Sequence, residues 1–467
     1  TGVDLRHGAK PFFVTTCRPD GTQTWWEWDV DPLTREPMIP AEDLAHITHL
    51  TIDRGAGTLV LQNAKFDVRA LGALKGDFSR CWRWVDTHDT LIGAHLLASN
   101  RPKDLTSLAL QYLNVNIQPL EDKLKVACET ARRYCRTNLK DWAIAKEGRP
   151  DMPSAKEKVW KYDTWLPKAV LREVGADRLS EHYGEDLSWW GTALRDYANA
   201  DSAVTVAIWQ VMEREIRRRN LWDIYECRRQ AVPLAYELET RGVTVSKVRL
   251  DELTDTFRRE SEACGAVCVN IAAGMGHHLD LPKNGVNQSL RTFCFDGLDL
   301  EPIHSKKAKT DAPTLDKEAF RYYEESLPPF GRALGFVKSL VTKRKRDTSL
   351  QYMEGYQRFW KAVPGEEGWY RLHPSFNPTG TDTLRWSSQN PNAQNISKQE
   401  GLNLRYCFGP APGREWWSLD AKNIELRLPA YESGEEDLIA LFERPDDPPY
   451  YGSNHILVFH LLWPELW

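Results

Sequence analysis

Two acidic residues near the end of the sequence, Asp420 and Glu425, have a spacing that suits metal-assisted chemistry. Residues 416–419 are mostly apolar and lead directly into Asp420, so we expect a buried strand that stops at a carboxylate. Glu425 follows about one helical turn later, in the helix expected next. A carboxylate held at a strand end can bind a divalent cation. The alternative is an acid that only caps the following helix.

The segment around Asp420 contains three ordered patterns. A Thr-x-Thr-x-Arg-x-Ser-Ser run begins at Thr381, a Pro-Asn-x-Gln-Asn-Ile run begins at Pro391, and an Asp-x-x-x-Ile-Glu-Leu-Arg run begins at Asp420. In this order and spacing they resemble the palm of DNA polymerases of the bacterial polymerase I type, family A. The resemblance implies a DNA-directed DNA polymerase that uses primer-template DNA, deoxynucleoside triphosphates and two Mg²⁺ ions.

The resemblance also assigns roles to individual residues. Asp420 and the backbone carbonyl of Ala421 would hold metal. Glu425 would lie under the sugar of the incoming nucleotide and disfavour a 2′-hydroxyl, and Asn423 would lie near the same nucleotide. Arg385 would reach the minor-groove edge at the primer terminus, where every base pair offers an acceptor. Further DNA contacts are expected from amide and basic side chains: Asn392, Gln394, Asn395, Arg405, Lys343, Arg344, Lys345 and Arg346.

The sequence departs from the family pattern at several positions. Ala421 stands where the family commonly has a tyrosine, and Lys422 adds a charge beside it. Gln399 stands where an arginine is usual, with Lys398 next to it. Pro429 lacks the amide that would bond back along a helix, so we expect that helix to be kinked there or to begin later.

A second set of residues lies far upstream. Asn63 is followed four residues later by Asp67, and Tyr197 is followed four residues later by Asp201. In this order they resemble the second and third motifs of proofreading 3′-5′ exonucleases. By the resemblance Asp67 and Asp201 would be metal ligands and Tyr197 would position the attacking water, because two-metal hydrolysis needs several carboxylates. The alternative reading is a pair of helix caps and a packed tyrosine.

The first motif of those exonucleases, an Asp-x-Glu, is not in this sequence. The chain opens with Thr1 and reaches its first acid at Asp4, which fits a variable position beyond that motif. We therefore expect an exonuclease site that lacks half of its carboxylates. The chain also reaches residue 467 before the fingers helix and the second palm carboxylate of the family, so we expect it not to polymerise DNA by itself.

Sequence patterns predict the elements that position these residues. Residues 10–17 and 24–30 read as a hairpin around Pro-Asp-Gly, and residues 58–61 read as a short strand. Helical periodicity covers residues 202–212, 224–241 and 250–270, and Gly242 is a natural helix stop. The charged residues 120–168 carry no readable motif, and we interpret them as a helical insertion.

Together these features predict a mixed α/β and α+β fold. We expect a ribonuclease H-like exonuclease domain over residues 1–225, a helical thumb over residues 226–365, and a partial palm with the start of the fingers over residues 366–467. A non-catalytic DNA-binding relative, or one half of a split polymerase, remains as the alternative function.

Composition limits the classes of protein to which this sequence can belong. With 41% hydrophobic and 27% charged residues, and no apolar run of the roughly 18 residues that a membrane span needs, we expect a soluble, cytoplasmic and monomeric protein. The nine cysteines are scattered, which favours reduced thiols. The formal net charge of -5 gives no global attraction to DNA, so binding must come from local groups such as residues 343–346.

Overall fold

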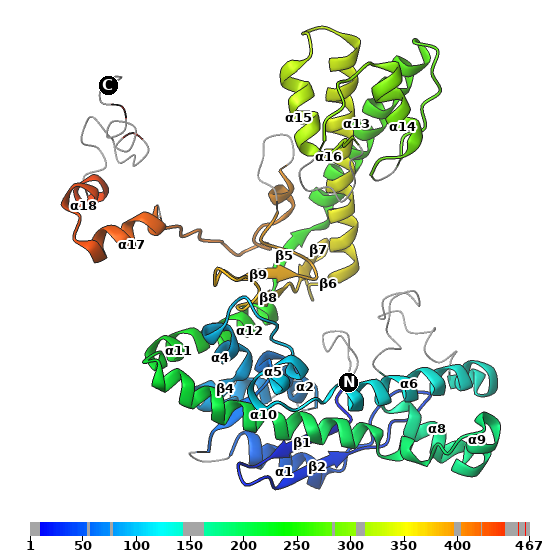
Figure 1. Ribbon diagram of the computed structural model, residues 1–467, viewed down its shortest axis with the longest axis vertical. Helices are drawn as coiled ribbons and strands as arrows, with labels where there is room; N and C mark the ends of the chain where they lie inside the picture. Colours follow the sequence, from blue (N-terminus) through cyan, green and yellow to red (C-terminus); the bar gives the residue numbers. More distant parts are fainter. Residues whose placement is uncertain are drawn as a thin grey trace. The chain divides into compact units, whose positions relative to one another are not determined.

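The structure, a computed structural model, describes residues 10–53, 57–74, 78–142, 163–282, 285–304, 313–396, 403–421, 423–443, 456 and 463 (Figure 1). It divides into two compact units, Thr1–Gly409 and Pro410–Trp467. Among the residues considered above, Asp4, Lys398, Gln399 and Lys422 lie outside the described ranges, as do residues 143–162 of the expected insertion.

The N-terminal region, residues 10–241, begins with the predicted hairpin. Strands β1 (Phe13–Cys17) and β2 (Gln23–Glu27) pair antiparallel, with Val14 opposite Trp26. The Asp20 carboxylate accepts a hydrogen bond of 2.8 Å from the Thr22 amide and closes the turn. Trp26 and Trp28 are buried beside helices α1 (Ala41–Thr51) and α2 (Ala64–Leu74), which anchors the hairpin to the rest of this region.

A second, parallel pair of strands lies at the centre of the N-terminal region. β3 (Leu59–Leu61), which confirms the strand expected there, pairs with β4 (Thr87–Asp89), and α2 connects them. The chain between α2 and β4 also contains α3 (Phe78–Cys81) and a 3₁₀ turn at Trp84–Asp86. The helices packed around this pair share one buried cluster: α4 (Thr90–Leu97), α5 (Leu105–Leu113) and α10 (Ala193–Arg218).

The described parts of the expected insertion, residues 120–142 and 163–168, are mostly helical and contain most of α6 (Gln118–Asn138) and the start of α8 (Leu166–Val174). Beyond the expected bounds follow α9 (Ala176–Tyr183) and a 3₁₀ turn at Ser188–Gly191. Ala127, Ala131 and Cys135 recur at four-residue spacing on α6 and are fully buried, because that face packs on Trp165 and Trp190. Trp165 and Trp190 therefore belong to a local core.

The expected helix over residues 224–241 is two helices instead. α11 (Trp222–Arg229) ends before α12 (Ala231–Arg241) begins, with Gln230 between them. Pro233 has no amide proton to donate to the Arg229 carbonyl, so the hydrogen-bond pattern of a continuous helix is interrupted at this point. The predicted stop at Gly242 is confirmed. Its φ is +64°, and an added Cβ would lie 2.3 Å from the Leu372 carbonyl oxygen, so only glycine fits this turn.

Two long helices dominate the chain after residue 246. α13 (Lys247–Ala273), which confirms the helix expected over residues 250–270, runs side by side with α16 (Arg332–Phe359), as Figure 1 shows. Shorter elements pack at one end of this pair around a core that includes Phe293, Phe320 and Phe336: α14 (Gln288–Thr292), a π turn at Phe293–Gly297, and α15 (Lys317–Ser326).

Small antiparallel sheets complete the first unit. β5 (Val243–Ser246), β7 (Trp369–Leu372) and β6 (Trp360–Ala362) form one sheet in that order. β8 (Ser375–Asn377) and β9 (Ser387–Gln389) form a separate two-stranded pair, here called the motif hairpin because the Thr-x-Thr-x-Arg pattern lies in its loop. A 3₁₀ turn at Leu404–Cys407 packs against the three-stranded sheet through Val245.

The described part of the second unit contains α17 (Ile424–Ser433) and α18 (Glu436–Glu443), which pack around Ala430, Leu441 and Phe442. α17 begins at Ile424 with Pro429 inside it, so the expected later start is wrong.

The strand expected before Asp420 is also wrong, because residues 414–421 are irregular. Trp417 is 85% exposed and Leu419 is 96% exposed. Within the described residues no strand pairs with this segment, so its amides and carbonyls have no ladder partners and its apolar side chains have no sheet to pack on.

Over the described residues the fold is thus a mixture of helices and small sheets, as expected. None of the helices described is both long enough and apolar enough to span a bilayer.

Candidate functional site

A cleft of about 1390 Å³ opens in the first unit. Asp67, Tyr197 and Asp201 all line it, so the structure brings together the three residues that the sequence singled out in this region. The cleft is lined by residues of β1, β3, α2 and α10 and by residues of the motif hairpin, such as Asn377 and Gln389.

Asp67 is positioned by the start of α2. The Asp89 carboxylate accepts hydrogen bonds from the backbone amides of Asn63 (3.0 Å) and Ala64 (2.9 Å), and from Leu91 at the start of α4 (2.9 Å). Asp89 is only 4% exposed and so fixes the first turns of two helices at once. Asp67 lies in the first turn of α2, four residues after Asn63.

Asp89 is a residue that the sequence analysis missed. The available signal was an aspartate directly before the apolar helix at residues 90–97, which is a typical N-cap pattern.

Tyr197 and Asp201 project from α10. Residues four apart lie on one face of a helix, so the Tyr197 hydroxyl is near the Asp201 carboxylate and, against the larger effect of burial, acts to lower its pKa. The hairpin holds this part of α10 in place, since Asn199 accepts hydrogen bonds from Thr15 Oγ1 (2.8 Å) and from Gln23 Nε2 (2.6 Å).

The acids in this cleft repel one another. Burial, followed by the negative charges of Asp89 and Asp201, raises the pKa of Asp67 to about 8. Burial also raises the pKa of Asp201 to about 7, against the hydrogen bond from Tyr197. Perturbed carboxyl groups gathered in a cleft are typical of functional sites, and a bound cation would stabilise their ionised forms.

The donor set of the cleft suits one Mg²⁺ ion and falls short of a two-metal site. Among the described residues no group of three or more His, Cys, Asp or Glu side chains is arranged to hold a metal. Mg²⁺ commonly keeps several waters and uses one or two carboxylates, so Asp67 and Asp201 suit a single ion. Asp89 does not add a ligand, because its oxygens already accept three amide protons. A two-metal site requires further acids.

The loop of the motif hairpin is tightly packed. An added Cβ at Gly380 would lie 1.9 Å from Ser387 Oγ, so no other residue fits there. Thr381 Oγ1 donates a hydrogen bond of 2.7 Å to the Arg385 carbonyl and closes the loop. The Arg385 side chain is exposed at the end of this loop.

The other candidates for DNA contact form two groups, the residues between Asn392 and Arg405 and the basic residues 343–346. Asn392 accepts hydrogen bonds from the amides of Gln394 (3.1 Å) and Asn395 (3.2 Å) and so closes a turn. Gln394 and Asn395 are exposed on that turn. Arg405 is exposed as well, and its Nε donates a hydrogen bond of 3.2 Å to the Ile396 carbonyl.

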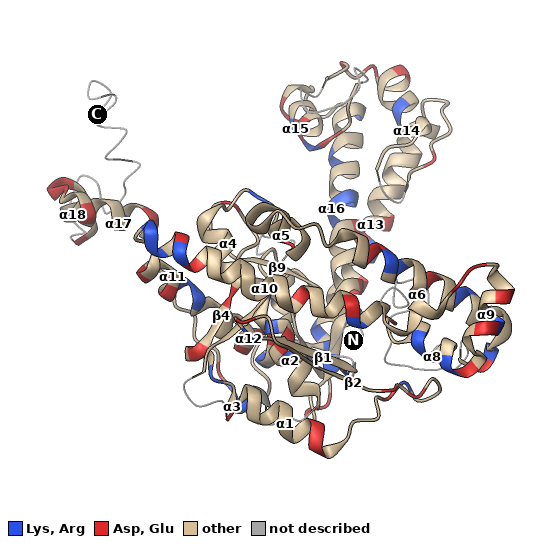
Figure 2. Cartoon of the chain, turned by 60° about the horizontal axis from the view of Figure 1, so that its bottom comes forward, with Lys and Arg blue, Asp and Glu red and all other residues tan. Residues whose placement is uncertain are grey.

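The basic cluster, residues 343–346, lies on α16, where Figure 2 shows Lys and Arg in blue, and most of its side chains are engaged inside the first unit. Lys343 pairs with Asp347 at 2.6 Å, and Arg346 pairs with Glu260. Arg344 donates hydrogen bonds to the carbonyls of Leu315 (3.1 Å) and Gly285 (2.9 Å). Lys345 is exposed. The cluster therefore contributes more to helix packing than its sequence indicates.

The polymerase-like residues of the second unit are exposed. Asp420, Ala421 and Glu425 lie on the surface of that unit, and Asn423 precedes α17 with a φ of 56°. The rigid strand end expected to carry Asp420 is not formed by the described residues.

Comparisons with known proteins all find similarity to DNA polymerases. Residues 249–449 match the model of DNA polymerase family A. The chain is 27% identical to DNA polymerase I of Chloroflexus aurantiacus over 253 residues, covering 53% of this chain and 25% of that protein. It is 28% identical to the thermostable DNA polymerase I of Thermus aquaticus over 283 residues, covering 60% of this chain and 30% of that protein. The chain thus spans less than a third of these relatives' length.

The fold is similar to a solved structure of the POL domain of Pol1 from M. smegmatis in complex with DNA primer-template and dNTP. The TM-score is 0.60 at 20% identity, and the similarity covers 93% of this chain and 58% of that one. The likeness in fold therefore extends well upstream of residue 249.

Proposed function

Residues 249–449 belong to DNA polymerase family A, and from this premise we propose that the chain is part of an enzyme that copies a DNA template by adding deoxynucleotides to a primer. The observation that carries the proposal is the ordered set of motifs at Thr381, Pro391 and Asp420, which falls inside the matched residues. The related POL domain was solved with primer-template DNA and dNTP, which supports the same partners here.

We assign the exonuclease-like domain to residues 1–225, the thumb to residues 226–365, and the partial palm with the start of the fingers to residues 366–467. The parallel β3–α2–β4 unit with its cleft of acids supports a ribonuclease H-like first domain. The paired helices α13 and α16 support the thumb. A cytoplasmic enzyme follows from this proposal.

For DNA contact, exposure separates the candidates. Arg385, Gln394, Asn395, Arg405 and Lys345 are exposed and serve as direct contacts, since phosphate and minor-groove contacts need accessible donors. The remaining candidates act mainly through the backbone or the packing that they hold: Asn392, Lys343, Arg344 and Arg346.

For the palm, the proposal rests on the sequence pattern. Asp420 and the Ala421 carbonyl would hold Mg²⁺, which neutralises charge on the transferring phosphate when bound. Glu425 and Asn423 would contact the incoming nucleotide. For these roles the exposed segment at residues 414–421 must acquire partners that order it.

In the cleft of the first unit, Asp67 and Asp201 would hold Mg²⁺ for removal of a primer-terminal nucleotide, and Tyr197 would orient the attacking water through its hydroxyl group. The exposure of Asp420 favours a second candidate function, a DNA-binding chain that does not catalyse by itself. Because this chain is not expected to polymerise DNA by itself, a primer-extension assay separates the two functions when it is done with a longer protein that contains the chain and the rest of the palm and fingers.

Binding of a fluorescent primer-template tests the proposed partners directly. Arg385→Ala should weaken binding by about 1 kcal/mol or more, because the side chain reaches a base edge. Lys345→Ala should weaken binding to all sequences alike and lower the slope of log K against log salt by about one. Arg178→Ala, an exposed arginine on α9, is the matched control and should change neither quantity. Equal binding by all variants would count against the proposed DNA surface.

A further inference from the structure

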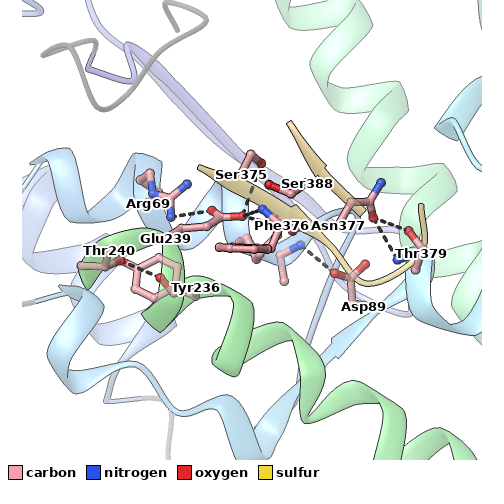
Figure 3. A network of polar contacts seen from close by, with 12 residues as sticks. Arg69, Asp89, Tyr236, Glu239, Thr240, Ser375, Phe376, Asn377, Thr379 and Ser388 are labelled. Carbon is pink, nitrogen blue, oxygen red and sulfur yellow. Dashed lines mark hydrogen bonds and ion pairs between the residues drawn. The ribbon is translucent and has the colours of Figure 1, made fainter. Parts of the chain in front are cut away.

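Glu239 lies at the meeting point of three segments that are distant in sequence. It is in the last turn of α12 and only 1% exposed, between α2 and the motif hairpin (Figure 3). Its carboxylate pairs with Lys65 at 2.6 Å and with Arg69 at 2.8 Å, both on α2. The same carboxylate accepts a hydrogen bond of 2.7 Å from the Phe376 amide in β8.

The charge on Glu239 is therefore well compensated. Burial alone would raise the pKa of this carboxyl group, but the charge of Lys65 and its hydrogen bond hold the pKa below its ordinary value. A buried carboxylate that is paired and hydrogen-bonded is an expensive arrangement to break, because removing one partner leaves the other uncompensated.

Both open backbone groups of Phe376 are bound by this pair. Phe376 lies opposite Ser388 of β9 in the hairpin register. Its amide bonds to Glu239, and its carbonyl accepts a hydrogen bond from Lys65 Nζ. A two-stranded hairpin is marginally stable alone. Here two charged side chains of the N-terminal region take the place that a third strand would occupy, through charge-assisted hydrogen bonds.

The loop of the motif hairpin is held at a second point. His95 on α4 is fully buried, and its Nε2 lies 2.8 Å from the Thr381 carbonyl oxygen. Arg228 lies 3.2 Å from His95 Nδ1. Because the guanidinium can only donate, Nδ1 accepts and Nε2 carries the proton that it donates to Thr381. The Thr381 hydroxyl in turn bonds to the Arg385 carbonyl.

We propose that Glu239, Lys65 and His95 are positioning residues, through which the N-terminal region sets the place and order of the loop that presents Arg385 to DNA. The inference rests on the proposed function, because it takes Arg385 as a DNA contact. It assigns the N-terminal region a part in DNA synthesis that does not depend on whether its own acids cleave DNA. α2 is shared by both sites, since Lys65 and Arg69 lie on one face of this helix and Asp67 lies between them on another.

Hydrogen exchange of the full chain, read by mass spectrometry on peptides that span residues 374–390, measures the order of the loop directly. Glu239→Gln should speed exchange there on the order of tenfold, the factor that corresponds to one lost charge-assisted hydrogen bond, and should weaken primer-template binding several-fold. Peptides from α14 and α15 should exchange as in the unchanged protein.

Two further variants keep the test decisive if Glu239→Gln does not fold. Lys65→Met removes the bond to the Phe376 carbonyl but leaves the Glu239–Arg69 pair. His95→Leu removes the bond to Thr381, whereas His95→Gln retains a donor at the position of Nε2 and should restore slow exchange. Restoration by glutamine is the result that a purely space-filling role would not give.

The outcomes test the positioning role and the proposed function separately. Unchanged exchange at residues 374–390 in all variants, or an equal rise throughout the chain, overturns the positioning role. If the unchanged protein does not bind primer-template, the proposed function fails, and the exchange data alone still decide whether the loop is held by the N-terminal region.

Discussion

The two units each contain an aspartate that stands just before a helix, and the two aspartates have opposite surroundings. Asp89 ends β4 beside a parallel neighbour, is buried, and binds three backbone amides. Asp420 precedes α17 in an exposed segment without a strand partner among the described residues. A local pattern of residues thus specifies a rigid carboxylate only where distant segments supply the second strand and the core.

The largest expected effect is on catalysis at Asp420. In a protein that contains this chain and extends a primer, Asp420→Ala should lower the extension rate by about a thousandfold or more, because several kcal/mol of charge stabilisation by metal are lost. Primer extension and duplex binding are measured together, and binding should stay largely intact. Asp437→Ala, an exposed acid of α18, is the control. Extension that survives Asp420→Ala would remove the proposed metal role.

A second expected effect concerns degradation in the cleft of the first unit. In a protein that completes this chain with the missing Asp-x-Glu motif, Asp201→Ala should lower 3′-5′ degradation of a labelled primer roughly a hundredfold or more, while leaving synthesis unchanged. Asp196→Ala on the exposed side of α10 is the matched control. Degradation that continues at the same rate would show that Asp201 has no part in it.

The third prediction compares Asp89 and Asp420 by stability. Asp89→Ala should lower the free energy of unfolding by about 2 to 4 kcal/mol, since three backbone amides lose a buried acceptor. Asp420→Ala should change that energy by less than about 0.5 kcal/mol, as for other exposed sites. Urea unfolding followed by circular dichroism measures both. Similar losses in the two variants would show that Asp89 and Asp420 contribute equally to the free energy of unfolding, contrary to this prediction.

The smallest expected effect is the pH dependence of the cleft. Carboxyl groups whose pKa is raised by folding make the folded state less stable as they ionise. Without divalent ions, stability should therefore fall as pH rises from about 4, the unfolded value, towards 7 to 8, where Asp201 and Asp67 titrate in the folded chain.

Melting temperatures at a series of pH values test this. Asp67→Asn should flatten the decline, and Mg²⁺ should raise the melting temperature at pH 8 more than at pH 5, because it binds the ionised form. A decline of the same size in Asp67→Asn would assign the pH dependence to other groups.

The sequence predicted elements whose signals are local. Pro-Asp-Gly indicated the first hairpin, helical periodicity indicated α10 and α13, and Gly242 indicated the end of α12. The break between α11 and α12 also had a local signal, Pro233, which the periodicity analysis did not take into account.

The features that sequence reasoning missed depend on long-range contacts. Nothing in the sequence of the basic cluster indicated that Arg346 would pair with Glu260 or that Arg344 would bond to the Leu315 carbonyl. Glu239 read as one helical charge among several, since its partners lie 174 and 137 residues away in the sequence. The apolar run before Asp420 matched a strand, but a strand needs a neighbour, and no local pattern reports whether one is present.

Gly242 has a practical consequence for engineering. With a carbonyl oxygen 2.3 Å from the point where a Cβ would stand, the passage from α12 into β5 admits no side chain. Chimeras that graft a foreign N-terminal region onto the remaining chain should therefore keep the native residues on both sides of this junction and place the crossover elsewhere. A crossover at this residue would shift β5, the first strand of the three-stranded sheet. The core that packs on this sheet would then be disturbed as well.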